Sequence, residues 1–325
     1  MKKTAKLLAL ALAVVMALSL GACAKKEPNA NANSGTYTVG ISQIVQHVAL
    51  DAATQGFKDA LVEEFGDSVS FIEQNAQGDP ATCAAIANSL VSSKVDLILA
   101  NATPALQAAA AATGDIPVLG TSITEYGVAL DIKDFSGTVG GNISGTSDLA
   151  PLAEQADMIH TLFPDAVTVG MIYCSAEANS LYQVETVRTA LEALGYNVEF
   201  YAFSDSNDLS AVANVAASTS DVIYIPTDNT VASNMGIIDN ICRPAQVPII
   251  AGEEGICRGG AVATLSIDYY DLGYATGKMA IRILKGEADI ATMPVEYAPN
   301  FTKKYNPEVC AELGVTIPDG YEALA

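Results

Sequence analysis

Two stretches, VDLILANATPA (residues 95–105) and DVIYIPTDNTV (residues 221–231), decide the fold of this chain. Each is a short apolar run followed at once by polar residues and then by a pattern of helical spacing. That order is typical of a β-strand that leads into an α-helix beside a parallel sheet. Because the two stretches are built alike and lie about 125 residues apart, they also suggest that the chain contains a repeat.

The alternation of short apolar runs with helical spacing continues through both halves of the chain. Expected strands of the first half are YTVGIS, VSFIE, VDLILA and IPVLG, with helices over residues 48–65 and 80–92 and from residue 104. Expected strands of the second half are AVTVGMIY, NVEFYAF, DVIYIP and VPIIAG, with helices over residues 178–194 and from residues 209 and 230. Such alternation indicates β-α-β units around mainly parallel sheets.

The two halves match element for element. Val39 aligns with Val169 at an offset of 130 residues, and Thr103 aligns with Thr227 at an offset of 124. A shared order of elements at a nearly constant offset indicates an internal repeat. The predicted fold class is therefore α/β, with two Rossmann-like lobes.

The chain continues beyond VPIIAG with AVATLSID, a helix over residues 269–284, VEYAP and a short helix near residues 307–313. We expect AVATLSID and its helix to return to the first lobe and the tail to return to the second. The backbone then crosses between the lobes near Leu149, Gly252 and Ala291, and the three crossings form a hinge. The expected lobes are residues 36–149 with 252–290, and residues 150–251 with 291–325.

The N-terminus has the order of an export signal: two Lys, an apolar core, then Leu20-Gly21-Ala22-Cys23. The last four residues resemble the lipobox of bacterial lipoproteins, in which the Cys carries the lipid. We therefore predict a signal peptide over residues 1–22, lipidation of Cys23 and a polar tether over residues 23–35. An ordinary secretory signal with a chance Cys is the alternative.

Composition excludes several classes of function. The formal net charge of -21 argues against a nucleic-acid partner, which requires clustered Lys and Arg. Beyond Cys23, five Cys and two His show no zinc-site spacing, so no metal and no cofactor are expected. Cys83 is interpreted as a small core residue. Cys242 and Cys257 bracket an expected strand, and both a disulfide and free thiols remain open for them.

The junctions after the expected strands are polar. They read SQIVQH, NAQGDP, NATP and TSITEYG in the first half, and CSAEANS and PTDNT in the second. Ligands of open α/β sheets bind at the carboxyl ends of strands, and two lobes that face each other there can close around a small molecule. Helix capping is the alternative for any one junction, as for Thr103 before Pro104.

The chemistry of the junctions differs between the lobes. The helix that starts at Thr103 offers free amides, and the hydroxyls of residues 121–124 add donors, which together suit a carboxylate. Glu177 and Asp228 of the second half start helices, where each either caps the helix or pairs with a ligand ammonium group. The combination favours a zwitterion.

An enzyme is not indicated. The chain has no Gly-x-Ser-x-Gly elbow and no phosphate loop, and Cys174 has no obvious His partner. The segment GTVGGNISG has glycine spacings reminiscent of a dinucleotide loop, but it does not connect the first strand and helix of a β-α-β unit. We interpret it as a turn-rich segment leading into the first crossing.

Several blocks together resemble the ABC-transporter substrate-binding lipoproteins associated with aromatic amino acids, chiefly tryptophan, with tyrosine and phenylalanine as variants. These blocks are IVQHVALDAATQGF, NAQGDPAT, VDLILANATPA, GNISGTSD, EANS, PTDNTV and SIDYYDLGYATGKMAIRILKGE. The resemblance covers about residues 37–315 and implies the type I periplasmic-binding fold. The chain departs from the family at Thr124-Glu125-Tyr126, where Thr-Asp-Pro is usual, and in the loop AGEEGICRGG.

The resemblance implies a ligand site at the same junctions. On the first-lobe wall it implies Gln43, Ile44, His47, Ala76 and Gln77, with Thr103, Ser122 and Thr124 holding the carboxylate. On the second-lobe wall it implies Glu177, Asn179 and Ser180, with Asp228 and Asn229 taking the ammonium group. For His47 a capping or packing role is the alternative, and for Tyr269 and Tyr270 we expect packing at the hinge. Asp51 is expected to interact with its helix dipole.

The function expected from the sequence is that of an extracytoplasmic lipoprotein, anchored to the cell membrane and monomeric. It would capture an amino acid, most simply Trp, Tyr or Phe, by hinge closure and deliver it to the permease and ATPase subunits of an ABC importer. A ligand-sensing ectodomain that partners a membrane receptor remains the alternative from another class. A sugar or nucleoside ligand is a further alternative, although the chain has no Trp for ring stacking.

Overall fold

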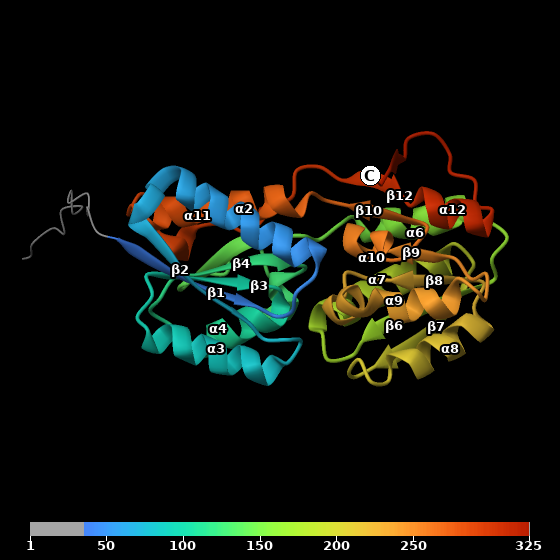
Figure 1. Ribbon diagram of the computed structural model, residues 1–325, viewed down its shortest axis with the longest axis horizontal. Coiled ribbons are helices and arrows are strands. Elements are labelled where there is room, and N and C mark those ends of the chain that lie inside the picture. The colour runs from blue at the N-terminus through green and yellow to red at the C-terminus, as the bar shows by residue number, and fades with distance from the viewer. Residues whose placement is uncertain (1–35, 325) are drawn as a thin grey trace, which may run out of the picture. The chain divides into compact units, whose positions relative to one another are not determined.

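The computed structural model describes residues 36–324, in which helices alternate with the strands of two separate sheets (Figure 1). The predicted signal peptide, tether and lipidated Cys23 lie outside the described residues. Within the described residues, no helix is both long and apolar enough to span a bilayer.

The first lobe contains a six-stranded sheet in the order β11-β5-β4-β3-β1-β2, with every neighbouring pair parallel. Its strands are β1 (Tyr37–Gln43), β2 (Val69–Asn75), β3 (Leu97–Asn101), β4 (Val118–Ile123), β5 (Ile143–Ser147) and β11 (Glu296–Tyr297). Its helices are α2 (Val48–Phe65), α3 (Pro80–Ser92), α4 (Thr103–Ala112), α5 (Tyr126–Ala129) and α11 (Tyr269–Leu284), with 3-10 turns η1 (Gly66–Ser68) and η2 (Ile290–Thr292).

Two helical layers cover this sheet, because its strands are apolar on both faces. Leu97 and Leu99 of β3 point toward α2 and α11, whereas Ile98 and Ala100 point toward α3 and α4. Figure 1 shows the two helix pairs on opposite sides of the sheet. Helices α2 and α11 approach closely at Gly273, where an added Cβ would lie 1.9 Å from the carbonyl oxygen of Ala53.

The second lobe contains a seven-stranded sheet in the order β13-β12-β10-β9-β8-β6-β7, parallel except where β12 runs antiparallel to β10. Its strands are β6 (Thr168–Cys174), β7 (Asn197–Phe203), β8 (Val222–Ile225), β9 (Ile249–Ala251), β10 (Ala263–Ser266), β12 (Thr302–Tyr305) and β13 (Glu322–Ala323). Its helices are α6 (Leu152–Leu162), α7 (Ala178–Ala193), α8 (Leu209–Thr219), α9 (Asn229–Cys242), α10 (Glu254–Arg258) and α12 (Pro307–Leu313).

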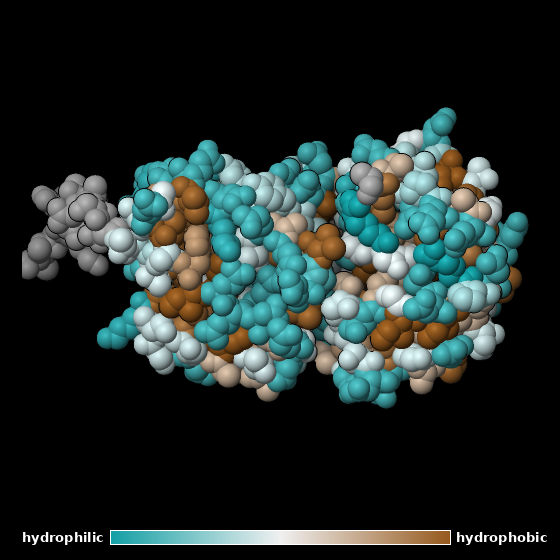
Figure 2. All heavy atoms as spheres, viewed as in Figure 1, coloured by the Kyte–Doolittle hydropathy of each residue, from teal (hydrophilic) through white to brown (hydrophobic). Residues whose placement is uncertain are grey.

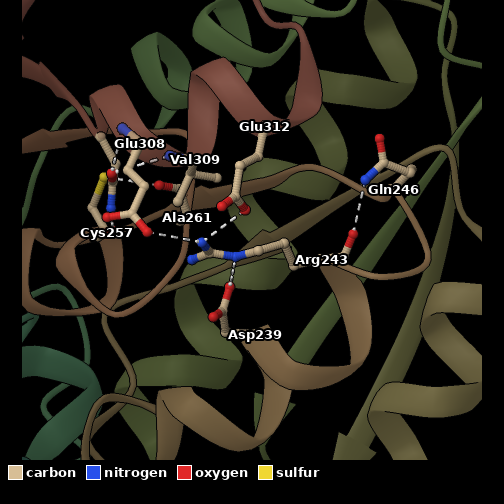
Figure 3. A network of polar contacts seen from close by, with 9 residues as sticks. Asp239, Arg243, Gln246, Cys257, Ala261, Glu308, Val309 and Glu312 are labelled. Carbon is tan, nitrogen blue, oxygen red and sulfur yellow. Dashed lines mark hydrogen bonds and ion pairs between the residues drawn. The ribbon is translucent and has the colours of Figure 1, made fainter.

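The core of the second lobe follows the same rule of alternation. Met171 of β6 packs with α6 and α7, and the next residue, Ile172, packs with α8 and α9 on the other face. At the end of α9, Arg243 forms ion pairs with Asp239, Glu308 and Glu312, which tie α9 to α12 (Figure 3).

The face seen in Figure 2 is mainly hydrophilic, with hydrophobic side chains scattered across it.

The predicted strands and helices on both sides of the repeat are present, but two elements differ from expectation. The end of the segment interpreted as turn-rich forms the start of β5, a strand of the first sheet. Its Gly145 has a φ of 144°, and an added Cβ there would lie 2.0 Å from the carbonyl oxygen of Gly120 on β4. Close packing against β4 therefore explains why this strand lacks large residues. Helix α6, which follows it, was not expected.

Two of the three predicted crossings are wrong in position. Strand β10 pairs with β9 and β12 and so belongs to the second lobe, not to the first. Helix α11 packs on α2, and β11 pairs with β5, so the first lobe takes residues 269–297 instead of 252–290. The connections run through residues 148–151, 267–268 and 298–301, not through Gly252 and Ala291. The reason is that the short helix α10 connects β9 directly to β10, the strand beside it in the same sheet.

The five Cys of the described residues are buried and free. Cys242 and Cys257 therefore form no disulfide. Cys83 packs in the core of the first lobe between α3 and the sheet, as predicted.

Candidate functional site

The predicted junction residues lie at the carboxyl ends of β1, β2, β3, β4, β6 and β8, where residues of the two lobes meet. A cleft of about 300 Å³ is lined from the first lobe by Ile44 and Gln77 and from the second by Glu177 and Asn229. The two lobes are linked at this point, since Nε2 of His47 lies 3.2 Å from Oδ1 of Asn229. His47 is thus a contact between the lobes, with Nδ1 buried and without a hydrogen-bond partner in the described structure.

Gln43 does not face the cleft with its amide group. Its Nε2 donates to Asp51 at 2.8 Å, and its Oε1 accepts from Thr54 at 2.7 Å and from Asn101 at 3.4 Å. This network anchors the start of α2 to the ends of β1 and β3. Asp51, expected to interact with the helix dipole, lies in the first turn of α2 and accepts this hydrogen bond.

The path of the backbone determines where the remaining predicted residues of the junctions after β1 and β2 lie. Ala76 is buried in the first-lobe core together with Ile44. Gln77 is exposed and has a φ of 56°, and its backbone amide donates to Asn75. Ile44 and Gln77 line the cleft, but Ala76 does not.

The junctions after β3 and β4 combine free amides with buried hydroxyl groups. Helix α4 starts at Thr103, and no side chain caps it, because Ala102 occupies the N-cap with a φ of 81°. Ser122 has a φ of 55°, and its Oγ is buried and has no hydrogen-bond partner in the described structure. Non-glycine residues with positive φ are strained and cluster at functional sites. Thr103, Ser122 and Thr124 are all buried.

Glu177 acts within the second lobe. It accepts from the side chain of Asn179, from the backbone and side-chain amides of Asn229, and from the backbone amide and hydroxyl of Thr230. All five donors belong to its own lobe, and four of them belong to the first turn of α9. The carboxylate therefore stabilises the start of that helix, where the dipole favours a negative charge.

Asp228 is the N-cap of α9 and also connects that helix to β6. Its Oδ1 accepts from the amide of Val231 at 2.8 Å, and its Oδ2 accepts from the amide of Cys174 at 2.7 Å and from Ser180 at 2.8 Å. Burial and the nearby charge of Glu177 raise the pKa of Asp228 to about 7. Ser180 is thus a partner of Asp228.

A second group of acids, which the sequence reasoning missed, lies beside the connections. Asp148 directly follows β5, and its Oδ2 accepts from the hydroxyl of Tyr269 at 2.9 Å. Burial raises the pKa of Asp148 to about 6, although the hydroxyls of Tyr269 and Thr124 oppose the shift. Glu253 follows β9 and caps α10. Burial raises the pKa of Glu253, and His47 opposes that shift.

The signal that could have found these acids was the one used elsewhere, a polar residue at the end of a strand. Asp148 lacks that signal in the sequence because the glycine-rich residues before it predict turns instead of a strand. Among the described residues, no group of His, Cys, Asp and Glu is arranged to hold a metal ion. The buried hydroxyls and carboxylates at the junctions can recognise a ligand by hydrogen bonds and charge.

Comparison with known proteins now adds to this geometry. The model of a family described as ABC transporter substrate binding protein matches residues 38–325. The chain belongs to this family. The substrate-binding protein is also 39% identical over 260 residues to the tyrosine-binding protein of Clostridioides difficile, covering 79% of this chain and 75% of the relative.

Two solved structures extend the similarity to the fold. The ABC domain from Streptococcus pneumonia in complex with L-Trp is 34% identical, with a TM-score of 0.85 over 89% of this chain and 100% of that one. The ligand-free, open structure of a substrate-binding protein with adhesive properties from Clostridium difficile is 35% identical, with a TM-score of 0.67 over 89% and 99%. The substrate-binding protein has the type I periplasmic-binding fold.

Membership of the family confirms the resemblance drawn from the sequence. The relatives are solute-binding proteins and not enzymes. Such proteins act outside the cytoplasm, where they bind a small molecule and partner an ABC transporter.

Proposed function

We propose that this substrate-binding protein captures an aromatic amino acid, with L-tyrosine and L-tryptophan as first candidates, between its two lobes. The observation that carries the proposal is the buried, unpartnered Oγ of Ser122 beside the uncapped start of α4. Buried polar groups are almost always hydrogen-bonded, so the unpartnered hydroxyl of Ser122, which does not itself line the 300 Å³ cleft, is a candidate ligand contact at the end of β4. The relatives supply the class of ligand, because one is named for tyrosine and another contains L-Trp.

The α-carboxylate is assigned to the first lobe. The amides at the start of α4 carry the positive end of the helix dipole and suit an anion. Thr103 at the first turn and Ser122 and Thr124 at the end of β4 add neutral donors. From the second lobe, Glu177 and Asn229 line the cleft, and the buried Oδ1 of Asn179, which does not line it, has no hydrogen-bond partner in the described structure.

The ring of the ligand is assigned to the cleft. Ile44, Val45, Pro80 and Pro104 provide apolar surface there, and polar groups of the second lobe face them. A volume of about 300 Å³ lies at the lower end of the range of small-molecule pockets. Aromatic rings bind well between apolar surfaces that keep one polar edge.

Glu125 and Tyr126, which depart from the family pattern, have structural roles in the first lobe. The side chain of Tyr126 is buried in the first lobe, stacks on Phe135 and donates to the carbonyl of Thr146. Glu125 caps the short α5 through the amide of Val128. Neither residue lines the cleft, so we do not assign ligand preference to this change.

The mechanism we infer is hinge closure. A ligand that touches both lobes stabilises the closed arrangement by its higher affinity for it. The structure resembles the L-Trp complex, with a TM-score of 0.85, more than the ligand-free, open structure, with a TM-score of 0.67. Delivery to the permease and ATPase subunits then follows from the family, and lipidation at Cys23, anchoring to the cell membrane and a monomeric state belong to the same proposal.

Calorimetric titration with the twenty amino acids, a set of sugars and a set of nucleosides tests the ligand class. We expect binding of Tyr, Trp or Phe in preference to all others. Tight binding of a sugar or nucleoside, with none of these three amino acids bound, would overturn the proposal. Mass spectrometry of the mature N-terminus tests Cys23: an unmodified Cys or cleavage elsewhere would remove the lipid anchor from the proposal.

A further inference from the structure

Asp148 is a buried acid with an unused oxygen. Its side chain is 4% exposed, Tyr269 occupies Oδ2, and Oδ1 has no hydrogen-bond partner in the described structure. A buried carboxylate oxygen without a partner costs free energy, because it has lost water and gained nothing in exchange. Such an atom can accept a hydrogen bond from a donor on a ligand.

The other buried acids of the described residues use both oxygens for their own lobe. These acids are Glu177, Asp228 and Glu253. Glu177 and Asp228 both serve the start of α9, and each oxygen of Glu253 accepts a backbone amide of α10. Pairing with a ligand would require these three to share oxygens that already hold a helix in place.

The sheet register places Asp148 next to the proposed carboxylate site. Ile123 of β4 is paired with Ser147 of β5, and the amide of Asp148 donates to the carbonyl of Ile123 at 3.1 Å. Asp148 therefore lies one strand away from Ser122 and Thr124. In an amino acid the carboxylate and the ammonium group are attached to the same carbon, so their binding groups must also be neighbours.

We propose that Asp148, and not Asp228, binds the α-ammonium group of the ligand, with Tyr269 orienting the carboxylate. This inference rests on the proposed function, since it assumes an amino-acid ligand. An ammonium donor fits a carboxylate that has one free oxygen, and a charge-assisted hydrogen bond in a buried site is among the stronger polar contacts. Glu253, whose charge acts on Asp148, adds a second negative group to the same region.

The position of the pair gives it a further consequence. Asp148 lies on the first connection between the lobes, and Tyr269 begins α11 directly after the second. A ligand ammonium group at Asp148 would thus contact the hinge segments as well as the lobes. Ligand binding would then order the connections themselves.

The test compares L-tyrosine with its des-amino analogue, 3-(4-hydroxyphenyl)propionate, by calorimetry on the purified full-length protein at pH 7.5. If tyrosine does not bind, L-tryptophan and indole-3-propionate form the equivalent pair. We expect the wild type to prefer the amino acid strongly. We expect Asp148→Asn to weaken binding of the amino acid by about 30-fold or more and to leave binding of the des-amino analogue within a few-fold of wild type.

Asp228→Asn is the competing variant, and Asp157→Asn, on the exposed face of α6, controls for loss of one negative charge. We expect both to keep the preference for the amino acid, and thermal unfolding of each variant establishes that it is folded. A preference that survives in Asp148→Asn and disappears in Asp228→Asn overturns the inference while the proposed function stands. A wild type that binds neither pair and does not bind L-phenylalanine overturns the proposed function itself.

Discussion

Asp228 and Asp148 are both buried acids that follow a strand, yet the structure uses them in opposite ways. Asp228 has three hydrogen-bond donors from its own lobe, whereas one oxygen of Asp148 has none in the described structure. The first acid holds α9 and β6 together, and the second is available to a ligand. The comparison shows that residue type and position at a strand end do not separate a capping role from a binding role. We propose that the number of internal hydrogen-bond partners separates the two roles.

The largest expected effect is on stability at Asp228. Asp228→Ala leaves the amides of Val231 and Cys174 buried and unpaired, so we expect a loss of about 3 kcal/mol in the free energy of unfolding. Urea unfolding of the ligand-free protein measures it. Asp79→Ala is the matched control, because Asp79 caps α3 from an exposed position, and its loss of stability should be clearly smaller. Equal losses for the two variants would contradict the special role of Asp228.

At Asp148 we expect a substitution to increase the free energy of unfolding instead of decreasing it. Because burial raises the pKa of Asp148 to about 6, its charge at pH 8 destabilises the ligand-free fold. Asp148→Asn removes that charge and should raise the free energy of unfolding by about 1 to 2 kcal/mol at pH 8, while impairing ligand binding. Denaturant unfolding without ligand measures the gain. A destabilised Asp148→Asn protein at pH 8 would show that the acid serves the fold, as Asp228 does.

The dependence of stability on pH sharpens the same contrast. Asp148 and Asp228 have folded pKa values raised to about 6 and about 7, above the ordinary range of an aspartate. The folded state therefore binds more protons than the unfolded state between about pH 4 and pH 7, and stability falls as pH rises through that window. The groups that act on Asp148 include Tyr269, Thr124 and Glu253.

Unfolding of wild type and Asp148→Asn at pH 5, 6, 7 and 8 checks this dependence. The fall should be shallower in the variant, because one of the titrating acids is gone. Identical pH profiles would show that Asp148 keeps an ordinary pKa in the folded protein.

The smallest effect is expected for the hydroxyl of Tyr269, whose removal should change ligand affinity. Tyr269→Phe removes the hydrogen bond to Asp148, and we expect affinity for the amino acid to fall about fivefold, which corresponds to about 1 kcal/mol. Tyr270→Phe is the matched control, since its hydroxyl donates to the surface residue Asp59. Calorimetry should detect no change in affinity for the control. An equal loss in both variants would place the effect in the packing of α11.

Most of the secondary structure was accessible from the sequence because its signals are local. The predicted boundaries of α2, α3 and α11 coincide with those of the structure, since apolar spacing and the caps Asp79 and Asp268 lie within the segments themselves. Strand β5 was missed because its glycine and small residues are explained by contact with β4. Strand β10 was assigned to the wrong lobe because periodicity does not say which sheet a strand joins.

The sequence by itself determined the α/β class, the two similar lobes, the family and the junctions at which we propose the ligand site. Each of these depends on patterns within a few residues or on a repeated order along the chain. Only the tertiary structure decided that Cys242 and Cys257 form no disulfide and that β10 belongs to the second sheet. It also decided which buried acids have both carboxylate oxygens hydrogen-bonded within the protein. The physical reason is that desolvation and hydrogen-bond partners come from residues distant in the chain. Asp148, for example, meets Tyr269 across 121 positions.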